Sequence, residues 1–178
     1  MAIGRVYNVD SGLTTGIGIG TGGTPGTEYV LMVGGITGAV EFNVSAVRVA
    51  TYSGSSASYP SNGTITWRIR RVSGATNGLF VGTANVNAVG QSTTFAASTW
   101  LYSTANGSGT GTYATYGNVL WAQTTPCTAG ANWGEWFTPG FELNVGNGPG
   151  TLLAVTYELG AAGTTSAVNL MPELVISE

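Results

Sequence analysis

The composition points to an all-β protein with little surface charge. The chain has 178 residues, enough for one domain with a sizeable core, and only 7% of them are charged. Abundant glycine and β-branched residues argue against a helical bundle, and the aromatic content argues against disorder. The net charge of −3, without any lysine or histidine, excludes a basic surface for nucleic acid.

The N-terminal region is expected to combine a short strand with an extended segment. Gly4–Asp10 is predicted as the first strand, with Val6 and Val9 facing inward. Ser11–Thr27 is mostly Gly, Thr and Ile, and so much glycine loses too much backbone entropy in a regular element unless neighbours hold it. Residues 1–27 are therefore expected to include an extended arm or a long loop.

The middle of the chain carries the alternating apolar patterns that are typical of strands. Thr64–Val72 alternates most regularly, with Ile65, Trp67 and Ile69 predicted to face inward. In Val40–Thr51 the apolar positions change phase, which indicates a β-bulge. The strands expected in this region are 28–33, 40–51, 64–72 and 116–122.

The C-terminal part is predicted to form a β-hairpin followed by a closing strand. Apolar residues alternate in Phe141–Val145, the segment Gly146–Gly150 is almost pure turn chemistry, and Thr151–Leu159 alternates again. Leu170–Ile176 is expected to close the chain, and Pro172 within it implies an edge position or a strand start.

Together the patterns predict a single antiparallel β-sandwich domain over residues 1–178, with roughly eight to ten strands. The connections are long, unequal and rich in Gly, Ser and Thr, which fits a Greek-key sandwich better than an up-and-down barrel. No period of 20 to 50 residues repeats, so a propeller or a solenoid is not expected. The favoured fold is jelly-roll-like.

The sequence offers few groups for catalysis. Without histidine, no Ser-His-Asp or Cys-His site can be assembled, and Cys127 is expected to be a buried or idle thiol. Glu135 and Glu142 could in principle form a two-carboxylate glycosidase site, or could simply face solvent. We therefore expect no enzyme activity, no cofactor and no metal.

Two groups of residues are candidates for binding. Arg68 and Arg70 alternate on one strand and so share a face, where they could pair with carboxylates of a neighbouring protein or with Glu on an adjacent strand. Trp133, Trp136 and Phe137 could stack on sugar rings, on another subunit, or on each other.

The start of the chain gives no targeting signal. Residues 1–5 lack the charged and apolar regions of a signal peptide, and no apolar run approaches the length of a transmembrane helix. Assembly in a cytoplasm, without a membrane partner, is expected.

A series of features along most of the chain forms a recognisable layout. In chain order they are Arg5-x-Tyr7, the long strand Phe42–Tyr52, the segment Arg68–Arg71, the Trp-containing Val119–Ala122, Pro139-Gly140 and the closing Glu173–Glu178. In this layout the chain resembles the small jelly-roll proteins of tailed bacteriophages that act as capsid cement or decoration proteins. It departs from that pattern in the Gly-rich residues 12–26.

The resemblance implies a homotrimer on the exterior of an assembled head, bridging neighbouring subunits of the major capsid protein after assembly in the host cytoplasm. An arm within Ala2–Thr27 would add main-chain hydrogen bonds to a neighbour's sheet edge. The alternative is a carbohydrate-binding jelly-roll module of a tail or fibre. The candidate protein-contact residues are Arg5, Tyr7, Arg68, Arg70, Trp133 and Trp136.

Overall fold

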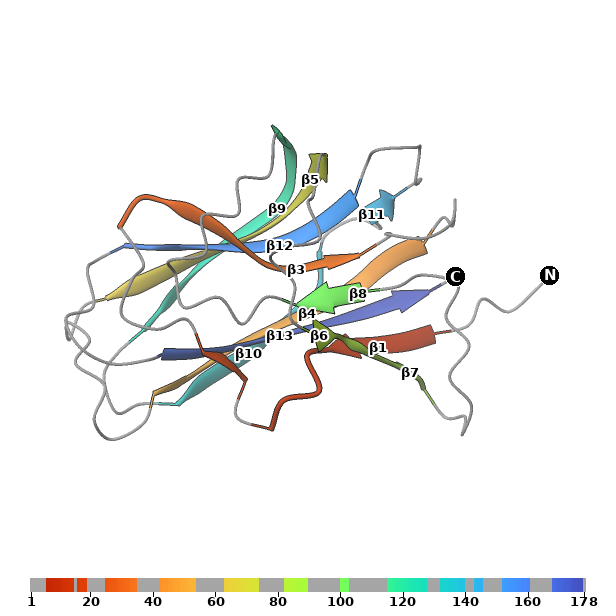
Figure 1. Cartoon of the computed structure of the whole chain (residues 1–178), viewed down its shortest axis with the longest axis horizontal. Coiled ribbons are helices and arrows are strands. Elements are labelled where there is room, and N and C mark those ends of the chain that lie inside the picture. Colours follow the sequence, from red (N-terminus) through yellow and green to blue (C-terminus); the bar gives the residue numbers. More distant parts are fainter. Residues whose placement is uncertain are drawn as a thin grey trace.

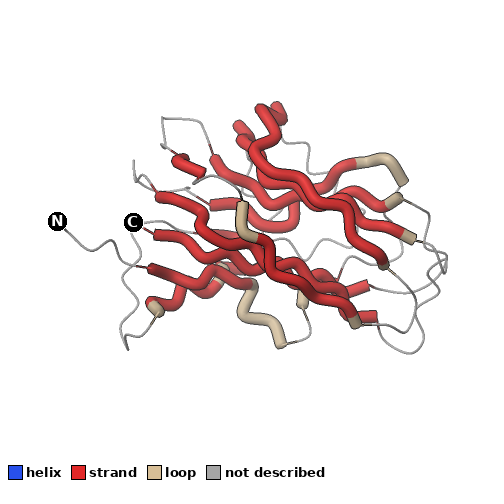
Figure 2. The backbone as a smooth tube through the Cα atoms, turned by 180° about the vertical axis from the view of Figure 1, so that it is seen from behind, coloured by secondary structure: helices blue, strands red, loops and turns tan. Residues whose placement is uncertain are grey.

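Every regular element in the described part of the chain is a β-strand (Figures 1 and 2). No helix is present there, and hence none that could span a bilayer. The all-β prediction is confirmed. The computed structural model describes residues 6–14, 16–18, 25–34, 42–53, 63–73, 82–89, 100–102, 115–127, 132–139, 143–145, 152–160 and 168–177.

The strands form two antiparallel sheets that pack against each other, which confirms the predicted β-sandwich (Figure 1). Sheet A has the order β10 (Trp133–Phe137), β4 (Phe42–Ser53), β13 (Val168–Ser177), β1 (Val6–Asp10) and β7 (Asn85–Ala88), with β11 (Leu143–Val145) also paired to β4 and β2 (Ile17–Gly18) also paired to β13. Sheet B has the order β6 (Gly82–Thr83), β8 (Trp100–Tyr102), β3 (Glu28–Gly34), β12 (Leu152–Leu159), β5 (Thr64–Ser73) and β9 (Thr115–Pro126).

The paired strands come from opposite parts of the chain in a nested series. β1 pairs with β13, β3 with β12, β4 with β10 and β11, and β5 with β9. In an up-and-down barrel, strands that are consecutive in sequence would be neighbours instead. The nesting favours a rolled antiparallel ribbon, and the jelly-roll connectivity itself stays a prediction.

The core lies between the sheets, and β5 contributes to it by regular alternation. On β5, Ile65, Trp67 and Ile69 are fully buried, as predicted, while Arg68 and Arg70 lie on the opposite face. Burial of each large apolar side chain contributes about 1.5–3 kcal/mol.

The phase change in β4 is a β-bulge, as predicted. Val44 and Ala46 pair with consecutive residues of β13, so that Ser45 is the extra residue between them. Because of this extra residue, Val44 and Val47 both reach the core although three positions separate them.

The predicted hairpin is wrong. β11 pairs with β4 in sheet A, whereas β12 lies between β3 and β5 in sheet B. Turn residues indicate where a chain reverses, but they do not determine which strand the next segment pairs with. β12 is buried on both faces through Leu153–Tyr157, which suits a central strand with two partners rather than half of an isolated hairpin.

The N-terminal strand differs from the prediction in one residue, Val6. Tyr7 and Val9 face the core, while Val6 is 39% exposed, because residues three apart cannot share a strand face. Of the two forms expected for the segment that follows β1, an arm or a long loop, the described residues 11–14 form a loop. β2 then pairs with β13, and Ile17 is buried in the core.

Pro172 lies in a central strand, so the predicted edge position is also wrong. Its neighbouring strand on one side is interrupted, since β1 ends with Asp10 opposite Glu173 and β2 resumes with Ile17 opposite Leu170. No residue of β1 or β2 pairs with Pro172 itself. The missing N–H is therefore tolerated, because this short stretch of β13 has a local edge.

Candidate functional site

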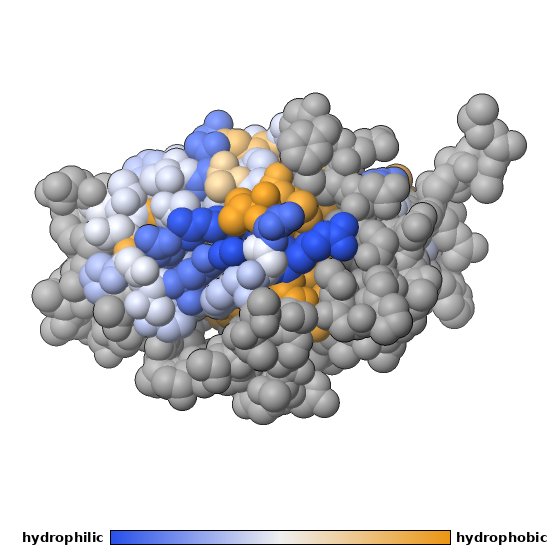
Figure 3. Space-filling view, turned by 90° about the horizontal axis from the view of Figure 1, so that it is seen from above, coloured by the Kyte–Doolittle hydropathy of each residue, from blue (hydrophilic) through white to orange (hydrophobic). Residues whose placement is uncertain are grey.

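Arg68 and Arg70 pair with carboxylates of their own sheet. Arg70 Nη1 lies 2.6 Å from Glu28 Oε2, and Arg68 Nη2 lies 2.8 Å from Glu158 Oε2. Of the two pairings expected for these arginines, the structure shows the one with Glu residues of the same chain. Figure 3, which looks down on sheet B, shows the hydrophilic side chains as diagonal bands beside hydrophobic ones.

The Glu28 carboxylate is the centre of this network. Thr156 donates its hydroxyl to Glu28 Oε1, while Arg70 also donates to the Gly117 carbonyl oxygen, 2.7 Å from Nη2. The Arg70 guanidinium lies 4.7 Å from the centre of the Tyr116 ring. Burial and the nearby Glu28 raise the pKa of the Tyr116 hydroxyl, although Arg70 opposes the shift. These contacts hold β3, β5, β9 and β12 together, so the network is structural.

The aromatic residues of β10 separate onto two faces. Trp133 and Phe137 face inward, with ring centres 6.5 Å apart, and Trp121 of β9 lies 5.6 Å from Phe137. This cluster joins an edge of sheet B to an edge of sheet A. Trp136 lies on the other face of β10 and is 49% exposed. Trp133 is therefore a packing residue, and Trp136 is available to a ligand or partner.

The remaining candidates lie in different environments. Tyr7 is buried in the core, which removes it from any partner's reach, and Arg5 and Glu142 lie outside the described residues. Glu135 is exposed on β10. Cys127 is buried, as predicted, and burial raises the pKa of its thiol to about 11. Among the described residues, no three Cys, Asp or Glu side chains are grouped so that they could hold a metal ion.

One row of side chains crosses the outer face of sheet A in register. Directly opposite residues of neighbouring strands share a face, and neighbouring strands lie about 4.8 Å apart, so five strands span about 19 Å. We call these residues the cross-sheet row; from β10 to β7 they are Trp136, Arg48, Glu173, Asp10 and Asn85.

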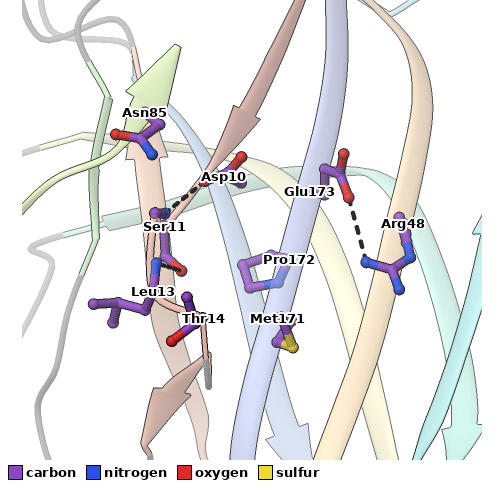
Figure 4. A pocket seen from close by; sticks show the side chains of 10 residues that line it. Asp10, Ser11, Leu13, Thr14, Arg48, Asn85, Met171, Pro172 and Glu173 are labelled. Carbon is purple, nitrogen blue, oxygen red and sulfur yellow. Dashed lines mark hydrogen bonds and ion pairs between the residues drawn. The ribbon is translucent and has the colours of Figure 1, made fainter. Parts of the chain in front are cut away.

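Four members of the cross-sheet row line a pocket of about 290 Å³ (Figure 4). Arg48 and Glu173 stand on one side of Met171 and Pro172, and Asp10, Asn85 and the loop of residues 11–14 stand on the other. The pocket occurs here because β1 and β2 are separated by this loop at the level of Pro172.

Local hydrogen bonds fix the loop that walls the pocket. Asp10 Oδ1 accepts a hydrogen bond from the Gly12 N–H at 2.5 Å, and Ser11 Oγ accepts one from the Leu13 N–H at 3.3 Å. Gly12 has a φ of 68°, and a Cβ at this position would collide with the side chain of Asn85. A glycine is thus required where the loop passes the pocket.

The charges of the cross-sheet row are partly compensated. Arg48 Nη1 lies 3.4 Å from Glu173 Oε2, and the two side chains are 35% and 20% exposed. Asp10 adds a second carboxylate, which leaves the row with a small negative charge. An anion would therefore meet two carboxylates and one guanidinium.

Sequence reasoning singled out only Trp136 from the cross-sheet row. Asp10, Arg48, Glu173 and Asn85 come from four separate strands, and only the register of the folded sheet brings them together. No local motif carries a signal for such a row.

Comparisons with protein-family models, with curated proteins and with solved structures find no match.

Proposed function

We propose that the chain is a non-catalytic structural protein of a virion that decorates the exterior of a tailed-bacteriophage head. In this proposal trimers bridge neighbouring subunits of the major capsid protein and raise the barrier to rupture of the head. The major capsid protein is proposed as the partner because the layout of the sequence resembles that of capsid decoration proteins. Many weak contacts suffice for the role, because a trimer on a repetitive lattice binds multivalently.

The observation that carries the proposal is that charged side chains pair with one another within the chain. Arg48, Arg68 and Arg70 each form an ion pair within the chain. In a chain with only 7% charged residues, few charges remain for hydration of the surface. The buried centres of protein–protein interfaces are likewise depleted of charged residues.

An apolar pair beside an edge of the described sheet A indicates where the chain could attach to the capsid. Val6 is 39% exposed and Val89 is 55% exposed, and the Val89 N–H donates to the Val6 carbonyl oxygen at 2.9 Å. β7, which Val89 follows, is an edge strand of the described sheet. Exposed β-branched residues on a sheet edge favour contact with another chain.

The test uses capsids assembled without this protein. The wild-type chain is expected to be a trimer by light scattering. It is also expected to co-sediment with these capsids and to raise the temperature at which they rupture. A V6S/V89S variant is expected to co-sediment about ten-fold more weakly, whereas V119S, which removes an equally exposed valine on β9, is expected to bind normally. Failure of the wild-type chain to co-sediment and to shift the rupture temperature would sink the proposal.

A carbohydrate-binding module of a tail or fibre is the second candidate, which the exposed indole of Trp136 favours. Antibody labelling of intact particles separates the two, because a decoration protein lies over the whole head and a fibre module lies at the tail.

A further inference from the structure

We infer that the cross-sheet row is a binding site for a neutral oligosaccharide. Trp136 would stack on one sugar ring, and the polar residues that follow it would hydrogen-bond the hydroxyls of the next rings. The inference stands whether or not the chain attaches to a capsid, and it gives the second candidate function a site and a ligand class.

Trp136 provides an open aromatic platform. Its neighbours on the same face are Gly134, two residues earlier on β10, and Arg48, directly opposite on β4. A Cβ at Gly134 would lie 3.1 Å from the Cβ of Ala50 and 3.5 Å from Arg48 Nη2. With Arg48 beside it, the indole is still 49% exposed. A flat, amphipathic ring of this kind suits the C–H face of a pyranose better than an aliphatic or charged group.

The hydrogen-bonding groups beside Trp136 match hydroxyls rather than ions. Arg48 offers only donors, Glu173 and Asp10 offer only acceptors, and Asn85 offers both. A sugar hydroxyl donates and accepts at once, so successive hydroxyls can satisfy every member of the row. A phosphate or sulfate group has few donors and would be repelled by the two carboxylates. A cationic peptide would be repelled by Arg48, which lies between the indole and the two carboxylates.

The shape of the site also suits a chain of sugars. The row is about 19 Å long at the usual spacing between strands, which accommodates several pyranose rings. The pocket of about 290 Å³ lies at the lower end of the size range for ligand sites, so it holds one ring rather than a large cofactor. The rest of the oligosaccharide would lie along the row toward Trp136.

The site is largely preformed. The bonds from Gly12 to Asp10 and from Leu13 to Ser11 fix the loop, and the Arg48–Glu173 pair holds two of the recognition groups in place. Binding therefore requires little ordering of side chains, and such preorganisation favours measurable affinity even for a shallow site.

The experiment begins with the full chain on an array of neutral and sulfated oligosaccharides. The probes are tetrasaccharides of β-1,4-glucan, α-1,4-glucan, β-1,4-galactan and α-1,6-mannan, each also in a sulfated form. Titration calorimetry then measures the dissociation constant for the best neutral probe. A neutral probe is expected to bind, and its sulfated form is expected to bind less well.

Variants locate the binding. W136A is expected to weaken it by about ten-fold and W136F by less, because a smaller ring keeps part of the stacking. N85A and E173Q are expected to weaken it while leaving the thermal unfolding midpoint near that of the wild type. The matched control V119A removes exposed apolar surface from sheet B and is expected to bind normally.

Three outcomes would overturn the inference: no neutral probe binding at millimolar concentration, a preference for sulfated probes, or W136A and N85A binding as well as V119A does. The V6S/V89S variant is expected to keep full affinity for the sugar. Loss of sugar binding and loss of capsid attachment are thus separate results, measured with different variants and different assays.

Discussion

The indole of Trp100 lies directly over Gly34 on the neighbouring strand. The two residues are paired between β8 and β3, Trp100 is fully buried, and a Cβ at Gly34 would overlap the indole ring. The glycine at this position is thus the partner that lets a large ring lie flat on the sheet, an arrangement that also shields the bare backbone.

Substitution of Gly34 by alanine is expected to lower the free energy of unfolding by about 3 kcal/mol, because neither the ring nor the backbone has room to move. Urea unfolding measures the loss. The matched control is Gly26→Ala, where φ is 75° but no atom lies within 4 Å of the new Cβ. That change is expected to cost about 1 kcal/mol from backbone strain alone. Equal losses would contradict the packing explanation.

Thr125→Val is expected to destabilise the fold by about 1–3 kcal/mol. Thr125 Oγ1 accepts a hydrogen bond from Trp67 Nε1 at 2.9 Å, and both residues are buried. Valine has nearly the same shape but leaves the indole N–H without an acceptor. Thr124→Val removes the exposed 3.0 Å bond to Thr66 instead, and should change the free energy of unfolding by less than about 0.5 kcal/mol. Comparable effects in both variants would show that the buried bond has no special weight.

Glu28→Gln is expected to lower the free energy of unfolding by roughly 2 kcal/mol, since Arg70 would lose its counter-charge. The Glu28 and Arg70 side chains are only 14% and 15% exposed, so water compensates incompletely. For Glu173→Gln the expected loss is below about 1 kcal/mol, because Arg48 is 35% exposed and its ion pair is longer, at 3.4 Å. Denaturant titrations of the two variants test this order, and its reversal would show that Glu28 is not the centre of the network.

The free energy of unfolding is expected to fall as the pH rises from about 9 to about 11. Burial raises the pKa of the Cys127 thiol from 9.0 to about 11, so in this window the unfolded chain has released a proton that the folded chain still binds. The raised pKa of Tyr116 acts in the same direction. Urea unfolding at pH 8 and pH 10.5 should show a smaller loss for Cys127→Ala than for the wild type. An unchanged loss would mean that the thiol does not contribute.

Thiol labelling gives an independent check on Cys127. The buried thiol is expected to react with an aromatic disulfide reagent at pH 8 only as fast as the chain unfolds, and to react at once in denaturant. Rapid labelling of the folded protein would contradict its burial.

The features that the sequence predicted correctly are those set by neighbours along the chain. The alternation of Ile65, Trp67 and Ile69 and the bulge at Ser45 follow from the period of a strand, which needs no knowledge of its partners. The burial of Cys127 follows from its apolar character and from the lack of a catalytic partner.

The features that the sequence could not predict depend on pairing between distant segments. The composition of residues 146–150 indicates a reversal, yet β11 and β12 belong to different sheets. A proline within a strand suggests an edge position, and only the gap between β1 and β2 explains why Pro172 is tolerated in a central strand. The cross-sheet row depends on four registers at once, and a shift of one residue in any of them would move a member to the other face.

The position of β13 has a consequence for how the protein is made. Residues 168–177 follow every other described strand in the chain, yet they fill the place between β4 and β1 at the centre of sheet A. Until this segment inserts, the edges of β1 and β4 that it will cover are unpaired and can pair with other chains. The speed of that insertion therefore sets how long these two edges are open to aggregation.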